Sequence, residues 1–162
     1  MSAWDVIART VSAEFADASD LEQMTRMVLR LLLAALLGGL MGLQREHSGK
    51  DAGIRTHMLV ALGAALFVLA PLQLGAGEDA TSRVVQGVVA GVGFLCAGTI
   101  LKTSSEDQVR GLTTAAGLWL TAAVGVAAGL GRETTAIISA LLALAVLSLE
   151  GPLRRLRRRR GD

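Results

Sequence analysis

The chain has 162 residues, of which 52% are hydrophobic and only 19% are charged. Soluble domains carry about a quarter charged residues, so this composition excludes a soluble enzyme built around one core in water. The net charge of +2 comes from an arginine-rich C-terminal end, and we therefore expect the bilayer, not nucleic acid, as the partner of these charges.

Residues 1–25 form the first predicted segment, with five acidic residues against Arg9 alone. Partly helical spacing of apolar residues predicts a short amphipathic helix on the membrane surface. The segment lacks the basic start and the continuous apolar stretch of a cleaved signal peptide. The apolar residues with this spacing are Trp4, Val6, Ile7, Val11 and Phe15.

Five long uncharged runs follow and together hold 91 residues. Their lengths are 14, 22, 18, 21 and 16 residues, whereas crossing a bilayer takes roughly 17–25 apolar helical residues. Three of the runs are long enough to cross a bilayer. The first run is long enough if Arg30 lies at the membrane interface. The fifth run is short but is flanked by Glu150 and the arginine tail. We predict an all-α membrane protein with a five-span domain at 26–150 and a cytoplasmic tail at 151–162. The predicted spans are 27–43, 57–74, 84–101, 112–130 and 134–149.

The distribution of Lys and Arg predicts the orientation of these spans. With five spans, the first and third loops share a side of the membrane with the C-terminus. That side collects eleven basic residues, whereas the opposite side holds five. We therefore expect the N-terminus outside and the C-terminus in the cytoplasm.

Three pairs of glycines lie four residues apart, which places each pair on one face of a helix. Small faces let helix backbones approach closely, so we expect a compact, glycine-rich bundle. Whether these faces meet within one chain or in a homo-oligomer stays open. The pairs are Gly38 and Gly42, Gly87 and Gly91, and Gly125 and Gly129.

The first two spans and the next two have similar layouts, each with a glycine-rich span, a polar loop and an Ala/Gly-rich span. This pattern is typical of a parallel two-helix repeat followed by a fifth helix. The alternative is that membrane helices of low complexity align with almost any other.

Polar residues at the span ends are the candidate functional residues. Arg26, Arg30 and Arg132 are interpreted as interfacial anchors. A second group, on the predicted cytoplasmic face, forms either a functional or assembly cluster or further anchors. On the other side, Arg83 and Gln86 open the third span, where Gln86 either bonds a neighbouring helix or lines a polar pathway. The cytoplasmic group is Arg45, Glu46, Arg55, Lys102 and Arg110.

The sequence gives little support to catalysis. His47 and His57 lack a metal-binding spacing, and no nucleophile motif or acidic residue lies inside a predicted span. The lone Cys96 excludes an internal disulfide and a CxxC site. We expect no enzyme, cofactor or metal site. Two functions remain, a membrane protein that binds other membrane proteins or a small ion or solute transporter or channel.

Four segments carry unusual strings, among them GIRTHMLVALGAALF and VRGLTTAAGLW. The segments are Gly38–Glu46, Ala52–Leu69, Ser82–Lys102 and Val109–Gly131. They resemble the membrane domain of the MgtC/SapB family. The resemblance extends from about Arg30 to Leu149.

The resemblance implies a bacterial inner-membrane protein with five spans and a cytoplasmic C-terminus. Founding members are associated with adaptation to low magnesium and with virulence, and are thought to regulate other membrane proteins, the ATP synthase among them, rather than to transport magnesium. Longer members continue into a soluble domain, which we expect this chain to lack, and Cys96 stands where the family more often has glycine. The polar positions that match the family pattern are Arg45, Glu46, Arg55, Thr56, Arg83, Gln86, Lys102, Arg110, Thr113 and Thr114.

Overall fold

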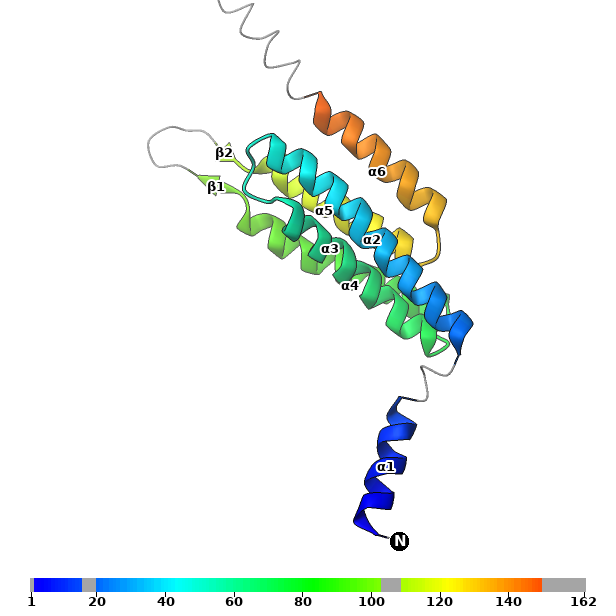
Figure 1. Ribbon diagram of the computed structural model, residues 1–162. Helices are drawn as coiled ribbons and strands as arrows, with labels where there is room; N and C mark the ends of the chain where they lie inside the picture. Colours follow the sequence, from blue (N-terminus) through cyan, green and yellow to red (C-terminus); the bar gives the residue numbers. More distant parts are fainter. Residues whose placement is uncertain (1, 16–19, 103–108, 150–162) are drawn as a thin grey trace, which may run out of the picture.

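A computed structural model describes residues 2–15, 20–102 and 109–149 of the chain (Figure 1). The predicted tail at 151–162 lies outside the described residues. The described part contains six α-helices and a short two-stranded antiparallel ribbon. The elements are α1 (Ala3–Glu14), α2 (Leu21–His47), α3 (Ile54–Gln73), α4 (Glu78–Gly98), β1 (Leu101–Lys102), β2 (Val109–Arg110), α5 (Leu112–Gly129) and α6 (Glu133–Ser148).

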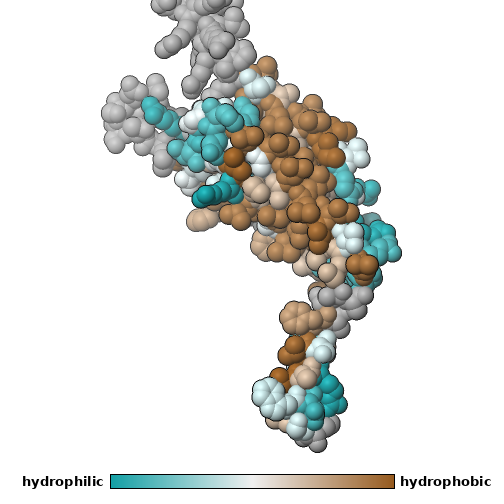
Figure 2. Space-filling model, viewed as in Figure 1, coloured by the Kyte–Doolittle hydropathy of each residue, from teal (hydrophilic) through white to brown (hydrophobic). Residues whose placement is uncertain are grey.

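Four of the helices, α2 to α5, are long and apolar enough to cross a membrane, and α6 is apolar but shorter, with 16 residues. The visible face of the bundle has a hydrophobic band with hydrophilic residues toward both ends (Figure 2). Large apolar side chains such as Leu59, Phe94 and Leu142 are well exposed, as they are where lipid is the solvent. The prediction of an all-α, membrane-integral protein is therefore confirmed, whereas the five-span count and the two-helix repeat stay predictions.

The first long helix begins earlier than the sequence predicts. α2 begins at Leu21, because the Asp20 side chain accepts hydrogen bonds from the backbone N–H groups of Glu22 and Gln23. Arg26 then pairs with Glu22 one turn away. The predicted boundary at residue 25 thus falls inside α2, since charged residues in a first helical turn do not end a helix.

The N-terminal segment contains a helix, α1, that buries none of its side chains. Ser2 and Asp5 form a capping box, in which each side chain bonds the backbone of the other residue. Trp4 and Phe15 are 77% and 70% exposed. The apolar face of α1 therefore has no partner within the described chain, and its location on a membrane surface stays a prediction.

Helices α2 to α6 run alternately up and down (Figure 1). One end of the bundle, called here the Arg45 end, holds the C-termini of α2, α4 and α6 and the N-termini of α3 and α5. The opposite end, called the Arg83 end, holds the connection from α3 to α4 and that from α5 to α6. α3 packs against both α2 and α5, whereas α4 packs mainly against α5.

Glycines in α2 and α5 allow both helices to pack closely against the backbone of α3. A Cβ added at Gly38 would lie 2.6 Å from the carbonyl oxygen of His57, and one added at Gly129 would lie 2.6 Å from that of Ala65. Only hydrogen fits between such backbones, so the glycines of α2 and α5 set their distance from α3. Gly42 and Gly125 likewise contact the α3 backbone, at Ile54 and Ala61.

The third glycine pair has no such contact. A Cβ at Gly87 or at Gly91 would meet no atom of the described chain within 4 Å. Of the three predicted packing faces, two are therefore filled by α3 of the same chain, and the face of α4 is open.

Candidate functional site

A polar cluster is buried inside the Arg45 end of the bundle. Arg45, in the last turn of α2, and His57, in the first turn of α3, are both 0% exposed. The Nη2 atom of Arg45 donates a hydrogen bond of 3.2 Å to Oγ1 of Thr114 in α5. A cation in the last turn of α2 also interacts favourably with the negative end of the helix dipole. Arg45 thus connects α2 to α5 within the bundle.

The imidazole ring of His57 is buried beside a glycine of α5. Its Nδ1 lies 3.0 Å from the carbonyl oxygen of Gly53, so Nδ1–H is the donor and the ring is fixed to the preceding turn. The other ring nitrogen, Nε2, has no hydrogen-bond partner among the described residues and faces Gly117 of α5, where a Cβ would lie 3.8 Å from it. A Cβ at position 117 would make an ordinary van der Waals contact with the ring, so the imidazole packs directly against the α5 backbone.

The residues that flank Arg45 along α2 join two further helices to the cluster. Glu46 accepts a hydrogen bond of 3.2 Å from the N–H of Ile54, at the start of α3, where Gly53 offers no side-chain cap. Gln44 donates 3.0 Å to the carbonyl oxygen of Leu147 near the end of α6. Three successive α2 residues therefore contact α6, α5 and α3, and the cluster closes this end of the bundle.

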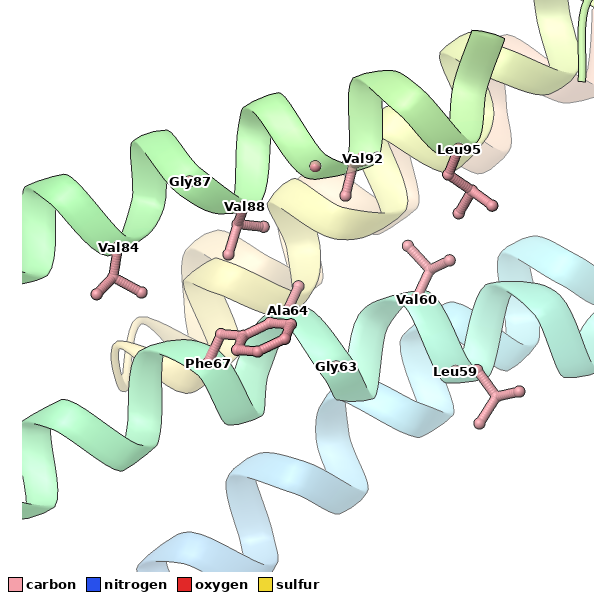
Figure 3. Close-up of a pocket in the computed structure, with 11 residues that line it drawn as sticks. Leu59, Val60, Gly63, Ala64, Phe67, Val84, Gly87, Val88, Val92 and Leu95 are labelled. Atoms are coloured by element: carbon pink, nitrogen blue, oxygen red, sulfur yellow. The ribbon is translucent and has the colours of Figure 1, made fainter. Parts of the chain in front are cut away.

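An apolar groove runs along the bundle between α3 and α4, with α5 behind it (Figure 3). Its volume is about 530 Å³ and every lining residue is apolar or glycine. Side chains of α4 point toward α3 across it. A Cβ added at Gly63, Gly87 or Gly91 would still meet no atom of the described chain within 4 Å, so the groove is open there. The lining residues of this α3–α4 groove are Leu59, Val60, Gly63, Ala64, Phe67, Val84, Gly87, Val88, Gly91, Val92 and Leu95.

Comparison with known proteins identifies the family. The MgtC family model matches residues 31–156. The chain belongs to the MgtC family. It is 48% identical over 130 residues to the protein SrpB of Synechococcus elongatus, an alignment that covers 74% of this chain and 71% of that protein.

Two MgtC proteins from other bacteria are also similar. Identity is 46% over 120 residues for MgtC of Brucella abortus and 42% over 117 residues for MgtC of Salmonella typhimurium. These alignments cover 74% and 72% of this chain but 49% of each relative, so the chain spans about half the length of these MgtC proteins. No solved structure matches the chain.

The structure brings together only part of the polar family pattern. Arg45 and Thr114 meet inside the bundle, and Glu46 lies beside them at the start of α3. Thr56 is half-buried, whereas Arg55, Arg110 and Thr113 are exposed. For Lys102 only the backbone is described, where it pairs with Val109.

The other two positions lie on α4, toward the Arg83 end. Arg83 and Gln86 are both exposed on the outside of the bundle. The amide of Gln86 therefore lines no route through the interior of the described chain, contrary to one of the two interpretations of the sequence. The reason is the position of α4 at the edge of the bundle, which leaves most of its circumference facing outward.

Sequence reasoning missed two buried polar residues, His57 and Thr121, and the half-buried Gln44. Thr121 donates 2.8 Å to the carbonyl oxygen of Gly117, one turn earlier in α5. A search for catalytic motifs looks at spacing along the sequence and therefore passes over His57. The residues that bury it belong to other helices and are distant in the sequence. The string RTH, which is Arg55, Thr56 and His57, was the signal that could have identified His57, because this string opens a span in the family pattern.

No arrangement in the described chain indicates metal binding. Among residues 2–15, 20–102 and 109–149, no group of three His, Cys, Asp or Glu side chains could hold a metal ion. Cys96 is buried, with its Sγ atom 3.1 Å from the carbonyl oxygen of Ala115. It serves as a packing residue between α4 and α5.

Proposed function

We propose that this MgtC-family protein is a regulatory, non-enzymatic protein of the bacterial inner membrane that acts in adaptation to low magnesium or to stress. Membership of the family and the MgtC names of its relatives support the physiological part. In this proposal it acts by binding other membrane proteins, and the bound partner is a transmembrane helix of another protein.

The observation that carries the proposal is the outward face of α4. Gln86, Ala90, Gly93 and Ala97 are spaced three or four residues apart along one side of the helix, and all four are exposed. An amide that faces hydrocarbon is unfavourable unless it bonds a neighbouring helix, and small residues beside it let that helix approach. We call these residues the Gln86 face, and it is distinct from the side of α4 that lines the α3–α4 groove.

The proposed topology has five spans, α2 to α6, with the N-terminus outside and the C-terminus in the cytoplasm. The 16 residues of α6 rise about 24 Å, which is close to a bilayer core when residues at both helix ends contribute. Basic residues are concentrated in the sequence segments that join α2 to α3 and α4 to α5 and that follow α6, and this distribution supports a cytoplasmic location for the Arg45 end. Cysteine labelling from outside the cell checks this, since Ser12→Cys should react and Ser48→Cys should not.

A photo-crosslinking experiment tests the partner. A photoreactive amino acid at position 90 of the full chain, expressed in its bacterial host, should yield a discrete adduct with a membrane protein that mass spectrometry identifies. Adding Gln86→Leu should weaken that adduct. The same photoreactive residue at Ala145, an exposed small position on α6, is the matched control and should not yield it.

Two outcomes would overturn the proposed mode of action. Adducts with lipid alone at position 90 would exclude a partner helix on this face. Ion or solute flux in liposomes that Gln86→Ala reduces would instead support the transporter or channel. A host strain that lacks the gene should grow more slowly at low magnesium, and unchanged growth would contradict the physiological part.

A further inference from the structure

The α3–α4 groove has the chemistry of a site for a hydrocarbon chain. None of its eleven lining residues carries a polar side chain, so water inside it would find no side-chain hydrogen-bond partner. Its volume of about 530 Å³ lies within the roughly 300–1,000 Å³ of sites that enclose small ligands. Gly63, Gly87 and Gly91 keep it wide, since a Cβ at any of them would meet nothing within 4 Å.

The length of the groove corresponds to one leaflet. Along α3 it extends from Leu59 to Phe67, a rise of about 12 Å, and along α4 from Val84 to Leu95, a rise of about 16 Å. The hydrocarbon core of a bilayer is about 30 Å thick, so one leaflet supplies about 15 Å. The groove therefore matches one acyl chain, whereas a transmembrane helix of a partner would need the full thickness.

The groove lies closer to the Arg45 end of the bundle. Leu95 is three residues from the end of α4 and Leu59 is five residues from the start of α3, or about 5–8 Å. Phe67 and Val84 are each six residues, or about 9 Å, from the helix ends at the other side. A lipid whose chain fills the groove thus enters from the leaflet at the Arg45 end.

A basic residue stands at this entrance. Arg55 precedes Leu59, Gly63 and Phe67 at intervals of four residues, so the four lie along one side of α3. Its side chain is exposed and forms no ion pair or hydrogen bond that the described residues provide. A guanidinium group there can bind a lipid phosphate in a bidentate manner. Arg83 has the corresponding place at the far end, with Glu78 and Asp79 one turn away.

We propose that the α3–α4 groove binds one acyl chain of an anionic phospholipid whose phosphate lies on Arg55. The inference is independent of the proposed function, because the groove and the Gln86 face are different sides of α4. It adds a lipid site that the family assignment does not supply.

Native mass spectrometry of the full chain, with dioleoylphosphatidylglycerol as the probe and dioleoylphosphatidylcholine for comparison, tests the proposal. Wild type should retain one phosphatidylglycerol molecule in preference to phosphatidylcholine. Gly91→Leu, whose side chain would enter the open groove, should abolish retention of both lipids. Arg55→Gln should weaken phosphatidylglycerol binding about fivefold, as expected for the loss of one basic residue near a lipid surface. It should weaken phosphatidylcholine binding less, because the choline cation beside the phosphate already offsets the attraction of an arginine.

Arg83→Gln is the matched control and should bind phosphatidylglycerol like wild type. Equal loss in the two arginine variants, or loss in Arg83→Gln alone, would overturn the assignment of the headgroup to Arg55. Retention that Gly91→Leu does not reduce would overturn the groove as the site. A change of oligomer size or loss of a protein partner in Gly91→Leu, without any change in bound lipid, would show that a second copy or a partner helix occupies the groove instead. Circular dichroism and gel filtration confirm that each variant is folded.

Discussion

Helices α3 and α4 follow one another in the chain, have similar lengths and are both apolar enough to span a membrane, yet they are buried to different extents. About 33% of the apolar window of α3 is buried, against 11% of that of α4. α3 has a helix on each of two sides, and the glycines of α2 and α5 contact its backbone. α4 carries its own glycine pair, and nothing in the described chain fills it.

The difference shows that a glycine pair on a helix does not by itself specify its partner. Gly38, Gly42, Gly125 and Gly129 contact an adjacent helix because α3 lies between them. Gly87 and Gly91 have the same spacing but belong to a helix at the edge of the bundle. Small residues on α4 leave space for molecules of the membrane. The lipid is proposed to bind on the side of Gly87 and Gly91, and the partner helix on the Gln86 face.

The largest expected effect is at a glycine that contacts α3. Gly125→Leu should lower the free energy of unfolding in detergent by about 3 kcal/mol or more, because the added side chain would overlap the backbone of Ala61. Gly125→Ala, with a single methyl group, should lower it by about 2 kcal/mol. Gly91→Leu should leave it unchanged or raise it slightly. Unfolding followed by circular dichroism measures this, and equal losses at both positions would refute the distinction between the two helices.

A smaller effect is expected where α2 and α5 are joined by the buried arginine. Thr114→Val has nearly the same shape but cannot accept the hydrogen bond from Arg45, so it should cost about 2 kcal/mol of unfolding free energy. Thr113→Val, at the neighbouring exposed position, is the control and should cost almost nothing. The same unfolding assay compares the two, and a larger loss at Thr113 would mean that the orientation of α5 is different.

A third, smaller effect is expected at the start of α3. Glu46→Ala should cost about 1 kcal/mol, because the N–H of Ile54 loses its acceptor at a helix start that has no other side-chain cap. Glu46→Gln retains an acceptor oxygen and should cost less. Asp51→Ala, an exposed acidic residue in the same loop, should be neutral. Hydrogen exchange at the first turn of α3 gives a local readout, and unchanged exchange in Glu46→Ala would contradict the capping role.

The smallest effect is at the opposite end of the bundle, between α2 and α6. Nε of Arg30 and Oε1 of Glu133 lie 3.7 Å apart, and both side chains are partly exposed. Glu133→Gln should therefore lower the free energy of unfolding by only about 0.5 kcal/mol. The difference from wild type should disappear at high salt, which screens exposed charges. Unfolding midpoints at two salt concentrations measure it, and a difference that salt does not change would indicate a buried interaction.

The predicted spans succeed and fail for local reasons. The predicted spans 112–130 and 134–149 agree to one residue with α5 and α6, because the charged residues Arg110, Arg132 and Glu133 lie close to the ends of these helices. α4 begins at Glu78, six residues before the predicted start, since a search for uncharged runs excludes the charged first turns of a helix. Acidic residues such as Glu78 and Asp79 in this first turn favour the positive N-terminal end of the helix.

The sequence alone determined that this is a membrane protein, because hydrocarbon requires long apolar helices and these are visible in single runs of residues. The strings GIRTHMLVALGAALF and VRGLTTAAGLW resemble the MgtC family, whose model matches the chain. Tertiary structure decided which glycines contact a helix, that His57 is buried beside Gly117, and that Gln86 faces outward. Each of these depends on which helices lie side by side. In lipid, apolarity does not distinguish the inside of a bundle from its outside, so side-chain type alone could not have placed them.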